Sequence, residues 1–495
     1  MSFDADIART DKRASQVARR IEADIVRRGW NVGESLGSEH ALQERYGVSR
    51  SVLREAVRLV EHHQVARMRR GPNGGLLICE PDAGPATRAV VIYLEYVGTT
   101  IEELLDARLV LEPLAASLAA ERIDEAGIEA LRAVLLAEER RKQASADEFH
   151  IALAKRSKNP VLQLFIEVLT SLTRRYALQS RTDSATEAVE ADRMRNDHSH
   201  IVAAVTAGDA ARAKTLSERH VEAVTARLRR HRPGDKTASP RRARESRGVS
   251  RLNNEAPRGK LAEVLAATIG DDIAACGWRI GSVFGTEAAL LERYRVSRAV
   301  LREAVRLLEY HSIAQMRRGP GGGLIVTKPQ AQASIDTIAL YLQYRRPGRE
   351  DLRCVRDAIE IDSVTKVVAK VGNRRTESDV AAFLDTHGRP TDLAFGENPR
   401  ESAGDVRTAS LEEFRFHVGL AQLAGNAPLD LFLRIIVELF RRHWSSTGQA
   451  LPTWSDVIAV ERAHQKIVEA ISAGDDSLAR YRLRRHLDAA ASWWL

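Results

Sequence analysis

The sequence predicts a mainly α-helical protein in which one arrangement of domains occurs twice. Residues 48–59 recur at 296–307, and only Ser51, which corresponds to Ala299, differs. Apolar residues follow a helical spacing through most of the chain, and strand patterns are confined to two short stretches in each copy. At 495 residues the chain is also too long for one ordinary core, which indicates several domains.

The repeat extends well beyond these twelve residues. At the same offset of 248 residues Trp30 matches Trp278, and the segment 68–76 matches 316–324. A repeat of this length indicates a duplicated multidomain unit of about 240 residues rather than a solenoid, whose repeats are much shorter.

The first part of each copy has the element order of a winged helix-turn-helix. Gly29 ends the first amphipathic helix, Gly47 supplies the turn, and Ser49 caps the third helix. Turn residues between two short apolar runs then indicate a β-hairpin. The expected helices lie at 14–28, 38–46 and 49–63, and the expected strands at 65–69 and 75–79. Winged helix-turn-helix domains are therefore predicted at 10–80 and at 258–328.

The second part of each copy predicts an all-helical bundle. Segments rich in Ala, Leu, Glu and Arg are separated by turn signals such as Asn159-Pro160 and Gly208-Asp209, without any strand pattern. Expected helices lie near 86–97, 101–121, 125–143, 146–157, 160–179, 185–207 and 209–231. The two bundle domains are placed at 86–231 and 331–494, and the second contains an irregular insert near 386–408 that is expected to be an exposed loop.

Residues 232–257, between the copies, are polar and basic. Their composition indicates a flexible linker, and contact of its arginines with phosphates is the alternative. The net charge of +8 likewise permits a polyanionic partner, although an Arg-rich solvated surface would give the same value. Three dispersed cysteines, an N-terminus without an apolar core and no long apolar run favour a reducing cytoplasm.

The third helix of each winged domain carries a stripe of cations. Arg50, Arg54 and Arg58 are spaced four residues apart, opposite an apolar face. A helix of this kind fits the DNA major groove, where Arg donates to guanine O6 and N7, and its first turn usually reaches the base edges. The alternative, a solvated face, is weakened by the recurrence of the arginines in the second copy.

These segments resemble a known family. Leu36-Gly37-Ser38-Glu39, Gly47-Val48-Ser49-Arg50 and Val52-Leu53-Arg54-Glu55-Ala56 are similar to the N-terminal domain of the GntR superfamily of bacterial transcription regulators. The helical domains resemble the FCD ligand-binding domain of its FadR subfamily, so the resemblance covers nearly the whole chain, twice. It implies a regulator, more often a repressor, that binds operator DNA and senses a metabolite. The DNA contacts that it implies are Arg50, Arg54, Arg70, Gly71 and His40, with Arg298, Arg302, Arg318 and Gly319 in the second copy.

Two departures from the family pattern lie in the winged domains. The position after the Ser-Glu pair is usually Arg in the family, but here it is His40 and Ala288. That contact is therefore expected to be weakened in the first copy and absent in the second. Gly47 corresponds to Arg295, which would cost about 1–2 kcal/mol if the position is left-handed.

Three histidines recur at matched places in the two bundles. The first set is His150, His198 and His220, and the second is His417, His464 and His486. Imidazoles from three helices can converge on a divalent ion, zinc or similar, although isolated helical histidines are the alternative. The resemblance implies an acidic fourth ligand one turn before the first histidine, where this chain has Ala146 or Glu413. We therefore expect the more complete site in the second bundle and a weaker or vacant three-His site in the first.

One arginine in each bundle is a candidate for effector binding. Arg108 with Glu112, and Arg356 with Glu360, are spaced as i,i+4 ion pairs on a helix. The resemblance implies instead that each arginine anchors a carboxylate of a small organic acid beside the metal. Both interpretations stay open.

The sequence favours a DNA-binding regulator over two alternatives. One is a metal-dependent enzyme using the three-His sites, but no nucleophile elbow, phosphate loop or HExxH motif occurs, so no enzyme is predicted. The other is a DNA-bound architectural protein with decayed sensor sites. We expect the joined copies to form an intramolecular pseudo-dimer on double-stranded operator DNA with two similar half-sites, associated with the nucleoid, and a further homodimer remains open.

Overall fold

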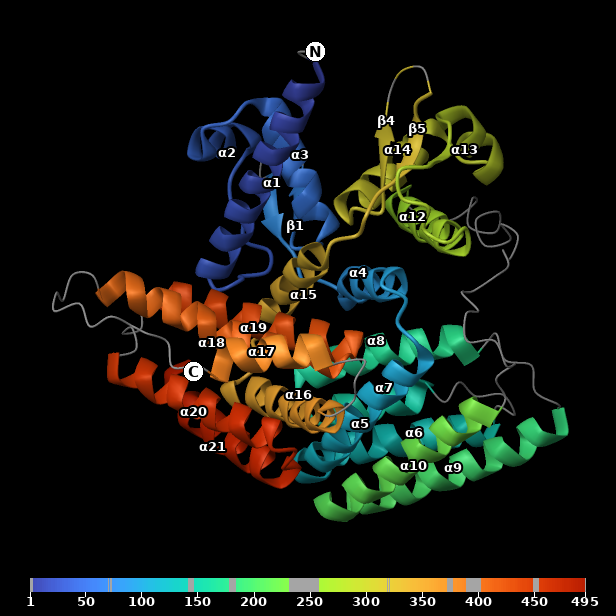
Figure 1. Ribbon diagram of the computed structural model, residues 1–495. Helices are drawn as coiled ribbons and strands as arrows, with labels where there is room; N and C mark the ends of the chain where they lie inside the picture. Colours follow the sequence, from blue (N-terminus) through green and yellow to red (C-terminus); the bar gives the residue numbers. More distant parts are fainter. Residues whose placement is uncertain are drawn as a thin grey trace. The chain divides into compact units, whose positions relative to one another are not determined.

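The computed structural model has the mainly helical fold class that the sequence predicts (Figure 1). It describes residues 3–69, 71, 74–140, 147–177, 184–230, 258–317, 319, 321–371, 377–388, 402–447 and 454–494. The linker expected at 232–257 and residues 389–401 of the expected insert lie outside these residues. The chain divides into two compact units, Met1–Gly98 with Asp235–Arg346, and Thr99–Gly234 with Pro347–Leu495. Each unit therefore combines corresponding parts of both copies.

The first unit contains two winged helix-turn-helix domains. The elements of the first domain are α1 (Phe3–Arg27), α2 (Glu39–Tyr46), α3 (Arg50–His62), β1 (Ala66–Arg69) and β2 (Gly75–Ile78). Helix α1 begins at Phe3, earlier than the apolar stripe indicated. Ser38 and Ser49 cap α2 and α3 by accepting hydrogen bonds from Ala41 N and Val52 N. The apolar stripes of α1 and α3 face each other and form the core, with Ile21, Ile25 and Leu53 fully buried.

The second winged domain differs from the first at two points. Its elements are α12 (Arg258–Ala275), β3 (Val283–Gly285), α13 (Glu287–Tyr294), α14 (Arg298–Tyr310), β4 (Ala314–Arg317) and β5 (Gly323–Val326). Strand β3 pairs with β5 and was not predicted, whereas the first domain has only an isolated bridge between Ser35 and Leu77 at that place. Arg295 ends α13 in the left-handed region at φ 51°, as Gly47 ends α2 at φ 61°. The second domain therefore carries the backbone strain of about 1–2 kcal/mol that the sequence indicated.

A pair of helices connects the two winged domains by crossing between copies. Helix α4 (Ala83–Tyr96) of the first copy packs against α15 (Ala331–Arg345) of the second, and Figure 1 shows the two side by side. Leu340 of α15 lies in the core of the first winged domain, and Ile92 of α4 packs on the core of the second. Each winged domain is thus completed by the helix of the other copy, which the sequence did not indicate.

Aromatic contacts repeat this exchange at equivalent positions. The rings of Trp30 and Tyr344 have centroids 5.4 Å apart, and those of Tyr96 and Trp278 have centroids 5.3 Å apart. The tryptophan of each copy thus contacts the tyrosine of the other copy. Such an exchange of equivalent partners is characteristic of an interface with two-fold symmetry.

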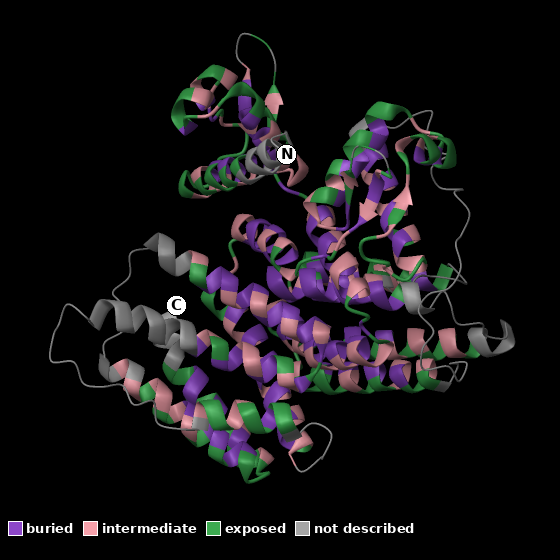
Figure 2. Cartoon of the chain, turned by 45° about the horizontal axis from the view of Figure 1, so that its top comes forward, coloured by how far each residue is buried: buried purple, intermediate pink, exposed green. Residues whose placement is uncertain are grey.

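The second unit contains two six-helix bundles. The first bundle comprises α5 (Ile101–Arg122), α6 (Glu125–Arg140), α7 (Asp147–Arg156), α8 (Pro160–Ala177), α9 (Ser184–Thr206) and α10 (Ala210–Arg230). The second comprises α16 (Arg349–Lys370), α17 (Glu377–Gly388), α18 (Ser402–Ala424), α19 (Ala427–Thr447), α20 (Trp454–Ser472) and α21 (Asp476–Trp494). Their buried residues follow the inward faces of these helices (Figure 2). Among the described helices, none is long and apolar enough to cross a membrane.

The two bundles pack on each other through equivalent side chains. Phe165 of α8 stacks on Phe432 of α19, with ring centroids 4.0 Å apart. The amide of Asn159 donates to the carbonyl of Asp351 at 2.9 Å, and the amide of Asn426 donates to that of Glu103 at 2.8 Å. This interface also has approximate two-fold symmetry, because the partners exchange roles between the copies.

Candidate DNA-binding surface and metal centres

Helix α3 presents two arginines that a single carboxylate holds. The Nε atoms of Arg50 and Arg54 donate to Oε1 of Glu39 at 3.0 and 2.8 Å. The side chains of Arg50 and Arg54 are 64% and 56% exposed, so the charged face of the helix is open to solvent. The hydrogen bonds from Arg50 and Arg54 keep the pKa of Glu39 below its usual value, so the carboxylate is ionised. We call Glu39, Arg50 and Arg54 the arginine clamp.

The second copy repeats the clamp in a looser form. Oε1 of Glu287 lies 3.1 Å from Nε of Arg298 and 3.6 Å from Nε of Arg302. These contacts are ion pairs that lack hydrogen-bond geometry. The two recognition helices therefore expose the same cations but hold them with different rigidity.

The other residues that are expected to contact DNA lie at the start of α2 and at the tips of the two wings. His40 is 82% exposed and lies 3.6 Å from Glu44. Gly71 and Gly319, at the two wing tips, have φ values of 115° and 105°, which only glycine adopts without strain. Arg70 and Arg318 lie outside the described residues.

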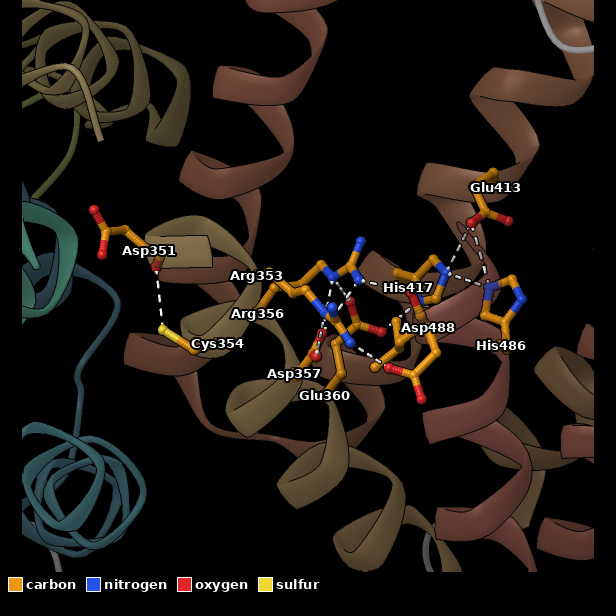
Figure 3. Close-up of polar contacts among 11 residues, drawn as sticks. Asp351, Arg353, Cys354, Arg356, Asp357, Glu360, Glu413, His417, His486 and Asp488 are labelled. Carbon is orange, nitrogen blue, oxygen red and sulfur yellow. Dashed lines mark hydrogen bonds and ion pairs between the residues drawn. The ribbon is translucent and has the colours of Figure 1, made fainter. Parts of the chain in front are cut away.

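The second bundle brings four expected metal ligands together. Glu413 and His417 of α18, His464 of α20 and His486 of α21 are all buried, and one ligand atom of each lies within 4.8 Å of the others. Figure 3 shows the carboxylate of Glu413 directed at His417 and His486. Nε2 of His486 is 3.2 Å from Nε2 of His417 and 3.3 Å from Nε2 of His464. The imidazole nitrogens thus converge on one point beside a carboxylate.

Negative charge surrounds one histidine of this second centre. His417 lies between Glu360, which contacts its Nδ1, and Glu413, which contacts its Nε2 at 3.2 Å. Burial alone would lower its pKa, but the two carboxylates raise the pKa of His417 to about 10. Burial lowers the pKa of His464 to about 4. The two carboxylates therefore favour a positive charge at this place, which a proton on His417 or a divalent ion would supply.

The first bundle also brings its three histidines together. His150 of α7, His198 of α9 and His220 of α10 are buried and form a cluster of ligand atoms. Nε2 of His198 is 3.3 Å from Nε2 of His220. Among the described residues, no carboxylate joins this cluster as Glu413 joins the other. Ala146, which corresponds to Glu413 in sequence, lies outside the described residues.

Carboxylates orient the histidines of this first centre from outside. Nδ1 of His150 lies 2.9 Å from Glu112, Nδ1 of His198 3.0 Å from Glu138, and Nδ1 of His220 3.5 Å from Asp197. A carboxylate on Nδ1 fixes the tautomer that leaves Nε2 free for a metal. Burial lowers the pKa of His150 to about 3, so its ring is neutral as metal binding requires.

Both donor sets fit a divalent ion of the zinc type. Two nitrogens at about 2.0–2.1 Å from a tetrahedral zinc ion lie roughly 3.3 Å apart. The Nε2 separations of 3.2 and 3.3 Å in the two centres match this value. In the second bundle three imidazoles and one carboxylate would hold such an ion, whereas in the first bundle three imidazoles would hold it.

The two effector-binding candidates lie beside these centres with different partners. Arg108 is buried and its Nε donates to Glu112 at 2.5 Å, while Glu112 also contacts His150. Arg356 is buried too, but its guanidinium bonds to Asp357 at 3.1 Å and lies 3.7 Å from Glu360 (Figure 3). Each arginine is therefore linked through a glutamate to the first histidine of its centre, so the i,i+4 ion pairs are part of a larger buried network.

Three features of the centres were missed in the sequence. Glu138 lies between Glu112 and His150, where the two copies differ in length, so the repeat gave no signal for it. The rings of Phe149 and Phe416 stack on His198 and His464, with centroids 3.7 and 3.8 Å apart. A Phe directly before the first histidine of each set, in both copies, could have indicated these stacks.

Known proteins share these domains. The sequence profile of the FCD domain matches residues 103–223 and 351–489, which together exceed half of the chain. The profile described as "Bacterial regulatory proteins, gntR family" matches residues 13–72.

Individual relatives cover about one copy of the repeat. RmpR of Mycobacterium gastri is 31% identical over 218 residues, which are 42% of this chain and 78% of RmpR. The HTH-type transcriptional regulator LutR of Bacillus subtilis is 29% identical over 205 residues, 39% of this chain and 90% of LutR. A solved structure, Streptococcus agalactiae GntR, is 23% identical and covers 43% of this chain and 99% of its own, with a TM-score of 0.32. The chain therefore belongs to the gntR family of bacterial regulatory proteins, as a DNA-binding transcription regulator with two FCD domains and not as an enzyme.

Proposed function

We propose that this regulator is a repressor whose binding to an operator is controlled by a small organic acid. The observation that carries the proposal is the pair of exposed arginine clamps on α3 and α14, each at the start of a recognition helix in a winged domain. Arg50, Arg54, Arg298 and Arg302 are the proposed base contacts. Arg50 and Arg298 lie on the first turn of their helices and Arg54 and Arg302 one turn further on, and an Arg at the start of a recognition helix can donate two hydrogen bonds to guanine. His40, Gly71, Gly319, Arg70 and Arg318 are proposed to contact the DNA backbone or the minor groove.

We propose further that one chain acts as a pseudo-dimer on two similar half-sites. The exchange of Leu340 and Ile92 between the winged domains supports this, because it ties both recognition helices into one compact unit. Covalent linkage also makes their association independent of protein concentration. Footprinting with the full chain should protect both half-sites at a one-to-one ratio of chain to DNA; protection of a single half-site per chain would count against the pseudo-dimer.

The effector is proposed to bind beside the metal centres. A divalent ion bound there would supply positive charge for a ligand carboxylate, and Arg108 and Arg356 would supply a second cation. Genomic binding-site mapping, followed by gel shifts with organic acids from the pathways of the mapped genes, tests the proposal. Release of the DNA by one such acid supports it. Binding that no acid and no metal affects would favour an architectural protein.

The base contacts give the first testable prediction. Arg50→Ala or Arg298→Ala should weaken operator binding roughly 10- to 100-fold, because one bidentate base contact is lost from one half-site. Arg58→Ala is the matched control, since Arg58 lies about two turns beyond Arg50 on α3 and its guanidinium donates to Glu55 at 3.0 Å. Fluorescence anisotropy at fixed salt measures the affinities. A loss with Arg58→Ala as large as with Arg50→Ala would contradict the assignment.

The centres give the second prediction, which concerns metal affinity. We expect two zinc equivalents per chain, with the tighter one in the second bundle because Glu413 completes its shell. Glu413→Ala should weaken this site at least tenfold and bring the two affinities together. Competition titration against a chromophoric chelator gives both constants, and His200→Ala, which removes an exposed histidine outside the centres, is the control. Equal affinities in the wild-type chain, or no binding in the second bundle, would disprove the ranking.

A further inference from the structure

The carboxylate of each arginine clamp belongs to a different element from the cations that it holds. Glu39 is the first residue of α2, whereas Arg50 and Arg54 are on α3. In the second copy Glu287 begins α13 and faces Arg298 and Arg302 of α14. The chain thus places an acid beside a surface that must bind phosphates, and it does so twice. A carboxylate at such a place repels the DNA phosphates, so it opposes DNA binding unless it also improves how the neighbouring arginines bind.

The contacts within the clamp indicate how Glu39 could improve the binding of the two arginines. Both arginines donate to Glu39 through Nε, at 3.0 and 2.8 Å, and Nη2 of Arg50 also donates to Glu39 at 3.5 Å. The terminal amino groups of Arg54 lie outside the contact with the carboxylate. Those two groups form the end-on fork that donates to O6 and N7 of guanine. A free Arg side chain loses considerable rotamer entropy when it docks, and an anchored one loses less. The carboxylate also offsets the repulsion between two cations one turn apart.

We propose that Glu39 is a positioning residue for base recognition. It holds Arg54 with both terminal amino groups available to base edges, and Arg50 with Nη1 available and Nη2 in a longer contact of 3.5 Å to the carboxylate. This inference rests on the proposed DNA contacts of the two arginines. Glu287 has the same role in the second copy, but it acts less strongly because its contacts of 3.1 and 3.6 Å lack hydrogen-bond geometry. The half-site read by α3 is therefore the more stringent of the two.

The alternative role for Glu39 is structural. An acidic residue in the first turn stabilises a helix by interacting with its dipole, and Glu39 occupies this place in α2. A structural role would lower binding to all DNA alike as the domain loosens. A positioning role would instead lower the ratio of operator affinity to nonspecific affinity, because nonspecific binding needs only the charges of the arginines.

The experiment measures this specificity ratio with the full chain. Two duplexes of equal length are used, one selected in vitro by the wild-type chain and one with the same bases scrambled. Glu39→Ala should lower the ratio about tenfold, through weaker binding to the selected duplex and equal or tighter binding to the scrambled one. Glu39→Gln should retain part of the ratio, because the amide oxygen still accepts from both Nε atoms. Glu287→Ala should have a smaller effect than Glu39→Ala.

Two controls separate the outcomes. Glu55→Ala removes another acid that pairs with an arginine on α3, and it should leave the ratio unchanged. Arg50→Ala, measured beside it, tests the proposed base contact: an unchanged ratio in that variant overturns the contact and the positioning role with it. If Arg50→Ala lowers the ratio and Glu39→Ala does not, the contact stands and the positioning role is wrong. Equal ratios for Glu39→Ala and Glu39→Gln, or a loss explained by a lower melting temperature, also overturn it.

Discussion

Replacing Leu340 by alanine is expected to destabilise the first winged domain, although Leu340 belongs to the second copy. Its side chain is 3% exposed and lies in the same core cluster as Ile21, Leu53 and Leu76. Truncating a buried leucine removes apolar contacts and leaves a cavity, which costs about 2–5 kcal/mol. Amide hydrogen exchange in α1 and α3 should therefore accelerate, while exchange in α12 and α14 should change much less.

A second leucine of the same helix provides the matched control for Leu340. Leu342 is fully buried in α15 but is not part of the first winged-domain core. Leu342→Ala should leave exchange in α1 and α3 near the wild-type rate, even though α15 itself loosens. The reciprocal variant Ile92→Ala should act on the second winged domain, with a smaller effect because Ile92 is only partly buried there. Equal acceleration by Leu340→Ala and Leu342→Ala would show that Leu340 has no special place in that core.

The crossing of α4 and α15 is the part of the fold that the sequence could not indicate. Trp30 and Trp278 occur at equivalent positions, and so do Ile92 and Leu340. These residues would pack equally well within their own copy, because both copies present the same apolar surfaces. Periodicity reports which face of a helix is buried and not which copy buries it. By contrast, caps and turns depend on neighbours in sequence, and they were located correctly at Ser38, Ser49 and Gly47.

In the candidate sites, too, the sequence indicated individual residues but not the contacts between helices that are distant in sequence. The six histidines were found because the duplication repeats them, and the structure brings each triplet together. Glu112 and Glu360 were recognised only as partners of arginines, because their second contact, with His150 or His417, comes from a helix distant in sequence. Glu39 was recognised as part of a motif, but its contact with two arginines depends on how α2 packs against α3.

Acidification is expected to destabilise the winged unit through a pair of histidines that joins its two domains. Nε2 of His62, at the end of α3, lies 3.2 Å from Nε2 of His311, which follows α14. One ring must donate and the other accept, so the accepting ring must be neutral, and protonation of both rings would break the contact. Burial, the other ring and nearby Arg88 lower the pKa of His62 well below its usual value, and burial lowers that of His311 to about 3.

The surroundings of this pair oppose protonation. His63 and the cation Arg88 add positive charge, and the ring of Tyr310 packs against His62 with centroids 5.3 Å apart. The nearby carboxylate of Glu22 pairs with His63 at 2.5 Å and not with His62 or His311. In the second copy Gly270 stands at the position of Glu22, so His311 has no equivalent acid. The equivalent contact between the copies pairs His63 with Tyr310, with ring centroids 4.7 Å apart.

The sign of the pH effect follows from the lowered pKa values. The unfolded chain binds protons at these histidines below about pH 6.5, whereas the folded unit does not until far lower pH, so stability falls as pH falls. For His311, with a folded pKa of about 3, the loss reaches roughly 2 kcal/mol by pH 5. The free energy of unfolding of the wild-type unit should therefore decrease between pH 7.5 and 5. In His311→Gln the decrease should be smaller by about this amount, because glutamine has no titratable group.

Tryptophan fluorescence can follow this unit alone. Trp30 and Trp278 belong to the winged unit, and the other four tryptophans, at 444, 454, 493 and 494, can be replaced by phenylalanine in every variant. Urea unfolding then gives the free energy at each pH, with His200→Gln as the control for an exposed histidine. A difference between wild type and His311→Gln that stays constant from pH 7.5 to 5 would refute the role of the pair. Because the pair joins the ends of α3 and α14, a loss of stability there would also loosen the spacing between these two helices, on which the proposed binding to two half-sites depends.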